Sequence, residues 1–148
     1  MVFNMGIKWE MCKKNPVVGV KQPKSDIIKI RFLLKGEVKK LLRVIEEKNH
    51  SEFLKLIKAY LNTGTRRIEI LPPLFTWDNV NLDDRKILIM GKGDRKRYIP
   101  INDTLYEIFI ENQNIGNEFP FQFKPDYVSR KIKYYYKIAG IEGANLHS

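Results

Sequence analysis

The spacing of apolar residues changes twice along this chain, and the change limits the folds that the chain can adopt. Residues 36–48 have apolar side chains at i, i+3, i+4 and i+7, which is the spacing of an amphipathic helix. A second helical pattern begins near Ser51, which can cap a helix, and ends at Gly64. Strand-like spacing follows between residues 77 and 100, and helical spacing then returns.

The middle region predicts a small antiparallel sheet. Residues 77–82 and 86–90 are bounded by polar residues and read as strands. Residues 91–94, Gly-Lys-Gly-Asp, are typical of a tight turn, and residues 97–100 return as the second strand of a β-hairpin.

Helical segments flank this sheet on both sides in the sequence. A short helical turn is expected at residues 65–71, before Pro72-Pro73. After the sheet, Asn102 or Asp103 can cap a third long helix, and residues 126–139 predict a fourth. We therefore predict an α+β fold, mainly helical, in which a small antiparallel sheet is a minor element.

The first 30 residues differ from the rest of the chain. Residues 1–14 can form the last turns of a helix, which Asn15-Pro16 would stop because proline disfavours helical geometry in the residue before it. Residues 16–30 combine prolines, a glycine and basic residues, as connectors do. We expect residues 1–30 to be the tail of another domain and a linker, and residues 31–148 to form one domain.

The net charge of +10 is concentrated in two parts of the chain. Residues 1–40 carry 10 basic and 3 acidic side chains, and residues 85–100 carry 6 and 1. Such clusters favour a polyanion such as nucleic acid, because each neutralised phosphate releases condensed counterions. A basic surface that serves solubility explains the charge equally well.

Composition excludes several other classes of protein. Cys12 is the single cysteine, so an internal disulfide and a cysteine-cluster metal site are excluded. The apolar runs are too short to span a membrane, and no secretory signal is recognisable. We therefore expect a cytoplasmic protein that does not associate with membranes.

Three stretches contain residues suited to binding or catalysis. In residues 63–69, Thr-Gly-Thr-Arg-Arg-Ile-Glu, a helix closes on glycine, and a rigidly held Arg66 could grip a phosphate while Glu69 orients it. In residues 91–100, a glycine-flanked Lys92 lies at a hairpin tip with basic residues behind it. His147 follows Ala-Gly-Ile at residues 139–141. Taken singly, these could be a surface ion pair, a solvated basic hairpin and a frayed terminal histidine.

In this order and spacing, the three stretches resemble the tyrosine recombinase, or phage integrase, family. That family has a Thr-Gly-x-Arg-x-x-Glu helix junction, a Gly-Lys-Gly hairpin that ends in a basic–hydrophobic–Pro sequence, and Ala-Gly-Ile leading to His-x-x-Arg-His. Residues 13–17 and 77–80 resemble the flanking segments of the family. The resemblance covers nearly the whole chain and is best from about Phe32 onward. A small basic nucleic-acid-binding protein with chance matches is the alternative outside this family.

The resemblance implies a fold, a reaction and roles for particular residues. Residues 31–148 would be part of a catalytic domain, and residues 1–30 the end of a DNA-clamping domain and its linker. A tyrosine would attack the scissile phosphate, with no metal or other cofactor. Arg66 would hold this phosphate with Glu69 as a supporting residue, Lys92 would protonate the leaving 5′-oxygen, and His147 would transfer a proton or contact the phosphate.

The expected partner is double-stranded DNA, on which parent proteins of this family assemble as homotetramers, and the protein would be associated with the nucleoid. DNA contacts are expected from four further basic residues: Arg67, Arg95, Lys96 and Arg97.

The sequence also departs from the family pattern. A second arginine, a further histidine and the nucleophilic tyrosine have no counterpart within the 148 residues, so the segment resembles a catalytic domain truncated at its C-terminal end. Tyr134, Tyr135 and Tyr136 precede His147 and are expected to alternate between core and surface. Whether the chain is itself an enzyme is left open. The alternative function is that of a catalytically inactive, DNA-binding remnant of an integrase.

Overall fold

The computed structural model describes residues 2–20, 31–91, 93 and 95–144. The chain divides into two compact units, Met1–Ile30 and Arg31–Ser148. In the first unit, helix α1 (Val2–Lys8) ends well before the expected stop at Asn15-Pro16, so that expectation was wrong. The helix ends early because Glu10 adopts a left-handed φ of 58° and the Met11 amide donates back to the Gly6 carbonyl at 2.8 Å.

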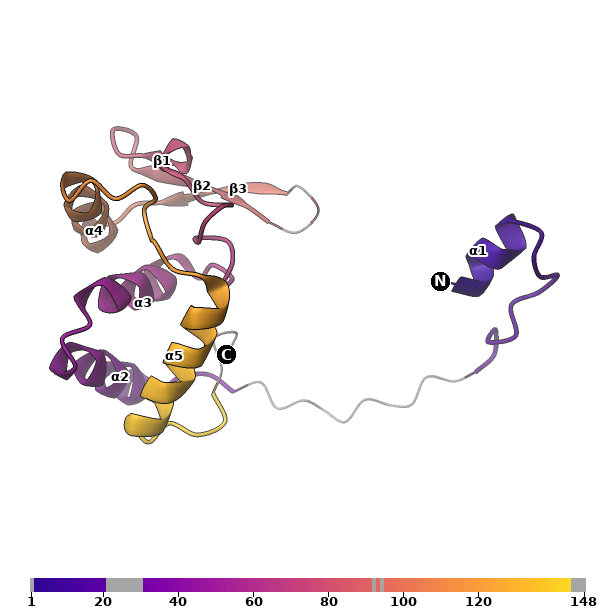
Figure 1. Cartoon of the computed structure of the whole chain (residues 1–148), viewed down its shortest axis with the longest axis horizontal. Coiled ribbons are helices and arrows are strands. Elements are labelled where there is room, and N and C mark those ends of the chain that lie inside the picture. The colour runs from indigo at the N-terminus through magenta and orange to yellow at the C-terminus, as the bar shows by residue number, and fades with distance from the viewer. Residues whose placement is uncertain (1, 21–30, 92, 94, 145–148) are drawn as a thin grey trace. The chain divides into compact units, whose positions relative to one another are not determined.

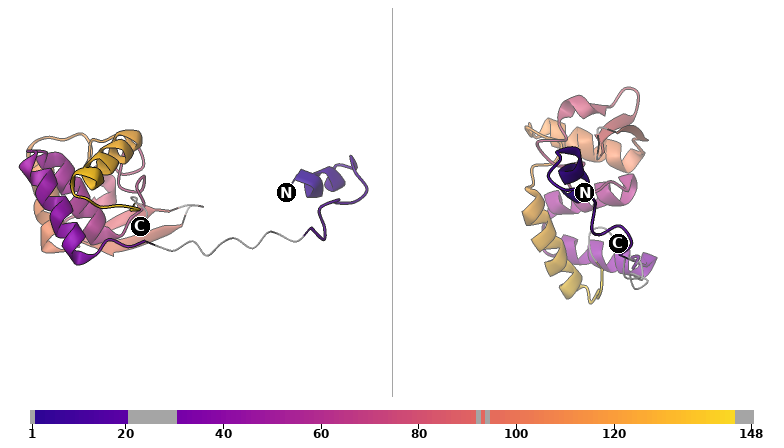
Figure 2. Two further views of the ribbon diagram at one scale, coloured as in Figure 1. Left: turned by 90° about the horizontal axis from the view of Figure 1, so that it is seen from below. Right: turned by 90° about the vertical axis from the view of Figure 1, so that its right-hand side faces the viewer.

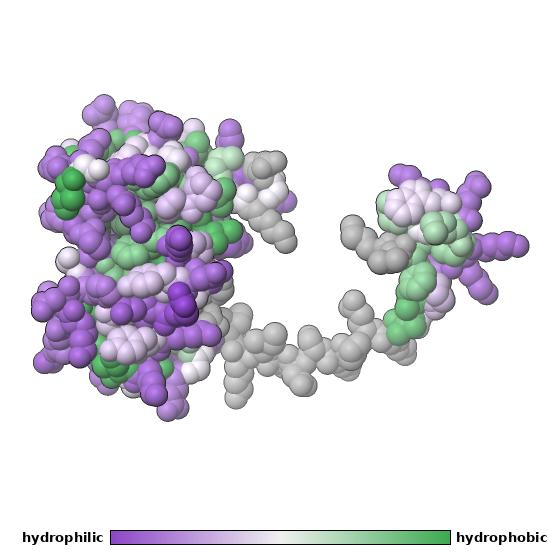
Figure 3. Space-filling view, in the orientation of Figure 1, coloured by the Kyte–Doolittle hydropathy of each residue, from purple (hydrophilic) through white to green (hydrophobic). Residues whose placement is uncertain are grey.

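The second unit contains four helices and one small sheet among its described residues, which confirms the predicted α+β class. Helix α2 (Lys35–Glu47) packs against α3 (Ser51–Thr63) and α5 (Pro125–Ile138), and α3 also packs against α4 (Asp103–Asn114). Figures 1 and 2 show α2, α3 and α5 grouped together, with the sheet and α4 at the other end of this unit. Most of its visible surface is hydrophilic (Figure 3).

The start of α2 has an unusual cap. Leu34 occupies the N-cap position, where its side chain cannot accept a hydrogen bond. The other half of a capping box is present, because the Glu37 carboxylate accepts the Leu34 amide at 2.8 Å, and Arg31 in turn binds this carboxylate. The hydrogen bonds from Arg31 and from the Leu34 backbone lower the pKa of Glu37 to about 2. A charged pair thus stabilises a helix start that lacks the usual Ser or Thr.

Helix α3 ends where predicted, but its N-cap lies one residue before the predicted one. Gly64 has a left-handed φ of 59°, and its amide donates to the Tyr60 carbonyl at 2.9 Å, so it is the expected C-cap. At the other end the N-cap is His50 and not Ser51, which is the first residue of the helix. The His50 ring faces α5, where its Nδ1 lies 2.7 Å from the Tyr135 hydroxyl.

The sheet has three antiparallel strands in the order β1 (Val80–Asn81), β2 (Lys86–Met90), β3 (Lys96–Pro100). In the β2–β3 ladder, Ile87 pairs with Ile99, and Ile89 pairs with Arg97. Ile87 and Ile89 are fully buried, so this face of the hairpin covers the core.

The predicted strand at residues 77–82 was mostly wrong. Trp77–Asn79 is a 3-10 turn (η1), and only Val80 and Asn81 pair with β2. The turn forms because the Asn79 side chain accepts the Thr76 amide at 2.8 Å, while the Trp77 indole donates to the Asn117 carbonyl at 2.8 Å.

The core contains two aromatic clusters. Between α3 and α5, the fully buried Phe53 lies 5.6–6.3 Å, centroid to centroid, from the rings of His50, Phe123, Tyr127 and Tyr135. Beside α4, the ring of Phe109 contacts three further aromatic rings, those of Phe75, Trp77 and Phe121.

The three consecutive tyrosines of α5 divide between core and surface. Tyr135 and Tyr136 are buried and Tyr134 is exposed, because consecutive residues on a helix lie about 100° apart around its axis.

Candidate functional site

Arg66 lies immediately beyond the end of α3, in a turn that side-chain hydrogen bonds hold. The Thr63 hydroxyl donates to the Ala59 carbonyl at 2.7 Å and lies 2.8 Å from the Thr65 hydroxyl. The next turn is closed by the Glu69 amide, which donates to the Arg66 carbonyl at 3.0 Å. The Arg66 side chain is 65% exposed, so a rigid backbone presents a guanidinium that solvent and ligands can reach.

Glu69 is the centre of this region. Its side chain is only 3% exposed, and its carboxylate accepts four hydrogen bonds from two arginines. The Arg66 amide and Nη1 donate to it at 2.7 and 3.0 Å. Arg97 Nη2 and Nη1 donate at 2.7 and 3.3 Å. We refer to Arg66, Glu69 and Arg97 as the arginine–glutamate cluster; its formal charge is +1.

The carboxylate of Glu69 is ionised despite its burial. Burial by itself would raise the pKa of Glu69. The hydrogen bonds from Arg97 and from the backbone and side chain of Arg66 outweigh this effect and lower the pKa to about 2. A fixed negative charge therefore orients both guanidinium groups at neutral pH.

The base of the β2–β3 hairpin adjoins the cluster. The Gly91 amide donates to the Arg95 carbonyl at 2.8 Å and closes the base of the loop. A Cβ atom at Gly91 would lie 3.1 Å from this carbonyl oxygen, 3.5 Å from Arg97 Nη1 and 3.8 Å from Glu69 Oε1. The residue that precedes Lys92 is thus packed against the same carboxylate that holds Arg66.

The other predicted site residues have separate surroundings. Arg95 and Lys96 are exposed. Arg67 Nη1 donates to the Ser129 hydroxyl of α5, so this guanidinium points to α5 while that of Arg66 points to solvent. Lys92 and His147 lie outside the described residues. Sequence reasoning missed the contact between Arg97 and Glu69, although strand alternation could have indicated it, since Arg97 lies on the same face of β3 as Ile99.

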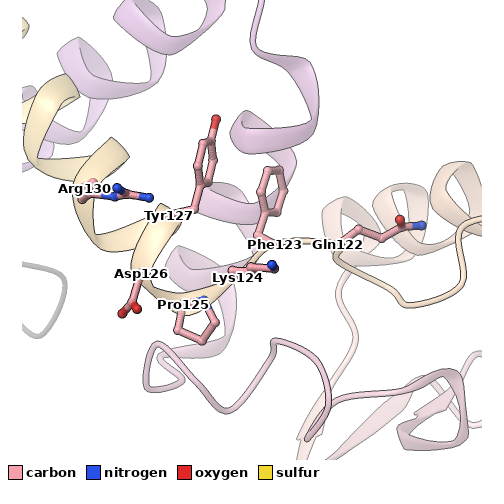
Figure 4. Close-up of a pocket in the computed structure, with 7 residues that line it drawn as sticks. All are labelled: Gln122, Phe123, Lys124, Pro125, Asp126, Tyr127 and Arg130. Atoms are coloured by element: carbon pink, nitrogen blue, oxygen red, sulfur yellow. The ribbon is translucent and has the colours of Figure 1, made fainter.

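An open pocket of about 790 Å³ lies at the start of α5 (Figure 4). The rings of Phe123 and Tyr127 stack there at 5.8 Å with an interplanar angle of 10°. Two cationic side chains, Lys124 and Arg130, and the carboxylate of Asp126 also line it. None of the helices among the described residues has both the length and the apolar composition of a membrane span.

Comparisons with known proteins agree on one family. The model of the phage integrase family matches residues 31–129. Tyrosine recombinase XerC of Listeria welshimeri is 24% identical over 87% of this chain and 43% of the relative. The integrase of Salmonella phage P22 is 27% identical over 95% of this chain and 39% of the relative. The chain therefore spans less than half the length of the curated relatives that it matches.

Solved structures show the same fold. A lambda integrase (75–356) dimer bound to a COC′ core site superimposes with a TM-score of 0.74, at 18% identity, over 98% of this chain and 58% of the integrase. XerH site-specific recombinase bound to its difH substrate superimposes with a TM-score of 0.62, at 23% identity, over 99% of this chain and 49% of XerH. Since the family model covers more than half of the sequence, the chain belongs to the phage integrase family.

Proposed function

We propose that this chain is part of a site-specific DNA recombinase of the tyrosine type, and that Arg66 binds the scissile phosphate. The observation that carries this proposal is an exposed guanidinium fixed by a buried carboxylate at the end of α3. Arg66 uses Nη1 to bind Glu69, and a guanidinium has five N–H donors, so donors remain for phosphate oxygens. The cluster's charge of +1 favours an anion there.

In the proposed reaction, Arg66 stabilises the charge that develops on the phosphate as a tyrosine attacks it. Lys92 donates a proton to the leaving 5′-oxygen, and the position of Gly91 beside Glu69 supports this role for the next residue. His147 contacts the phosphate or transfers a proton, a role that rests on the family resemblance. Residues 31–148 supply part of the catalytic domain, and residues 1–30 supply the end of a preceding domain and a linker.

The proposed partner is double-stranded DNA, bound by a homotetramer of the whole protein in the cytoplasm. Exposed Arg95 and Lys96 would contact the DNA backbone. Each phosphate that a side chain neutralises contributes about 0.9 to the slope of log affinity against log salt concentration. DNA binding is therefore expected to weaken strongly as salt increases.

Replacement of Arg66 by alanine tests the assignment of the phosphate site. We expect binding to a fluorescent duplex of mixed sequence to weaken roughly tenfold, because a charge-assisted contact is lost. We also expect the slope of log affinity against log salt concentration to fall by about 1, which corresponds to one phosphate contact. Fluorescence anisotropy at several salt concentrations measures both. Arg43→Ala is the matched control, since Arg43 is an exposed arginine of α2 that pairs with Glu47. Equal affinities of Arg66→Ala and the unsubstituted chain would refute the assignment.

A second measurement separates binding from strand cleavage. The polypeptide of residues 1–148 contains no tyrosine after His147, where the family pattern has its nucleophile. We therefore expect this polypeptide to bind a nicked suicide duplex without forming a covalent adduct, as judged by denaturing electrophoresis. An adduct that maps to any of its 7 tyrosines would contradict the proposed order of catalytic residues.

A further inference from the structure

Arg97 makes a two-point contact that crosses the fold. It lies on β3, 28 positions from Glu69 in the sequence, yet Nη2 and Nη1 lie 2.7 and 3.3 Å from the two carboxylate oxygens of Glu69. The Arg97 side chain is 39% exposed and that of Glu69 only 3%. Parallel donation to both oxygens holds a carboxylate in one orientation, which a single contact does not.

Both oxygens of Glu69 are shared between the two arginines. Oε2 accepts the Arg66 amide and Arg97 Nη2, while Oε1 accepts Nη1 of both side chains. Any rotation of the carboxylate away from Arg97 therefore also changes its contacts with Arg66. We infer that Arg97 is a positioning residue, which orients the Arg66 guanidinium through Glu69 and does not itself bind DNA. This inference rests on the proposed role of Arg66.

The packing at Gly91 adds a second, independent reason. A Cβ at this position would approach both Arg97 Nη1 and Glu69 Oε1 within 4 Å, so the hairpin base fits against the ion pair. Arg97 thereby connects two loops, the turn that carries Arg66 and the hairpin loop that begins at Gly91. The contact with Glu69 also explains why β3 has a cation on its inner face, the face that Arg97 shares with Ile99.

The other basic residues near the start of β3 have different surroundings from Arg97. Arg95 and Lys96 are exposed, and Lys96 lies on the opposite face of β3 from Arg97 because side chains alternate along a strand. If the hairpin contacts DNA, the exposed Arg95 and Lys96 can reach it, whereas both terminal nitrogens of the Arg97 guanidinium already donate to Glu69. The Arg66 guanidinium differs, since it donates to Glu69 through Nη1.

A double-mutant cycle in duplex binding tests the inference with the chain of residues 1–148. Arg97→Gln alone is expected to weaken binding roughly tenfold, about as much as Arg66→Ala. In the Arg66→Ala background, Arg97→Gln should have an effect of less than about twofold, because it acts through a side chain that is gone. Arg95→Gln is the matched control, and its effect should be the same in both backgrounds. Fully additive effects of Arg66→Ala and Arg97→Gln would overturn the inference.

Arg97→Lys separates positioning from DNA contact even if Arg97→Gln fails to fold. Lysine keeps the charge but cannot make the parallel two-point contact. We expect Arg97→Lys to bind DNA several-fold more weakly, and its salt slope to fall by no more than that of Arg66→Ala, because the only phosphate contact weakened is that of Arg66. Retention of full affinity would show that only the charge matters and would reject the positioning role. If Arg66→Ala itself has no effect on affinity, the proposed function fails, and this outcome is distinct from additivity.

Discussion

Replacing Phe53 with alanine is expected to lower the free energy of unfolding by about 3 to 5 kcal/mol. Phe53 is fully buried, and its ring contacts four other rings between α3 and α5. Alanine would leave a cavity that these large rings cannot fill without leaving their own packing positions. Chemical denaturation followed by circular dichroism measures the change.

The matched control is Leu61→Ala, on the same helix. Leu61 is 44% exposed, so its truncation removes much less apolar area from the core and should cost under about 1 kcal/mol. Similar losses for both variants would mean that the aromatic cluster does not stabilise α3. The comparison bears on the site because Gly64, which ends α3, leads directly into the turn that carries Arg66.

Glu69→Gln is expected to cost about 2 to 3 kcal/mol of folding free energy at neutral pH, because it leaves two adjacent guanidinium groups without their counter-charge. The substitution should also change how the folding free energy depends on pH in the acidic range. The pKa of Glu69 is about 2 in the folded chain, below its ordinary value of 4.5. A lowered pKa gives stability that is fully present above pH 4.5 and is lost as the pH falls towards 2.

The difference in stability between the unsubstituted chain and Glu69→Gln should therefore shrink over this pH range. Glu37 also has a pKa of about 2, so both proteins will lose some stability in acid, and the informative quantity is the difference between them. Denaturant titrations at successive pH values provide it. Glu107→Gln, at an exposed position of α4, controls for the loss of a carboxylate elsewhere. A difference that stays constant with pH would argue against the ion pairs of Glu69.

The long helices could be predicted from sequence because their signals are local. Apolar spacing located α2, α3 and α5 to within a residue or two, and Gly64 was identified as a cap from its residue type. The start of α4 was located by two candidate caps, of which Asn102 is the one the structure uses. The features that sequence reasoning missed depend on contacts between distant residues or on side-chain capping. At Trp77–Asn79, the aromatic and apolar content suggested a strand, while Thr76 and Asn79 close a short turn.

In the candidate site, the sequence predicted the contact between neighbouring residues but not the contact between distant ones. The Thr-Gly-x-Arg-x-x-Glu spacing correctly suggested that Glu69 holds Arg66, because the two are three residues apart in a turn. Arg97 was grouped with Arg95 and Lys96 as one basic stretch. The structure separates them, since Lys96 lies on the opposite face of β3 from Arg97, and Arg95 precedes the strand and is exposed. Arg97 faces inward, where the buried carboxylate of Glu69 binds it.

The pairing of Met90 with Lys96 and of Ile89 with Arg97 has a consequence for variation in this hairpin. A slip of one residue between the two strands would exchange their faces and bring Lys96 or Tyr98 opposite the carboxylate in place of arginine. A slip of two residues would keep the faces but displace the guanidinium along the strand by about 7 Å. Insertions and deletions that shift the alignment of these two strands are therefore expected to disrupt the contact between Arg97 and Glu69.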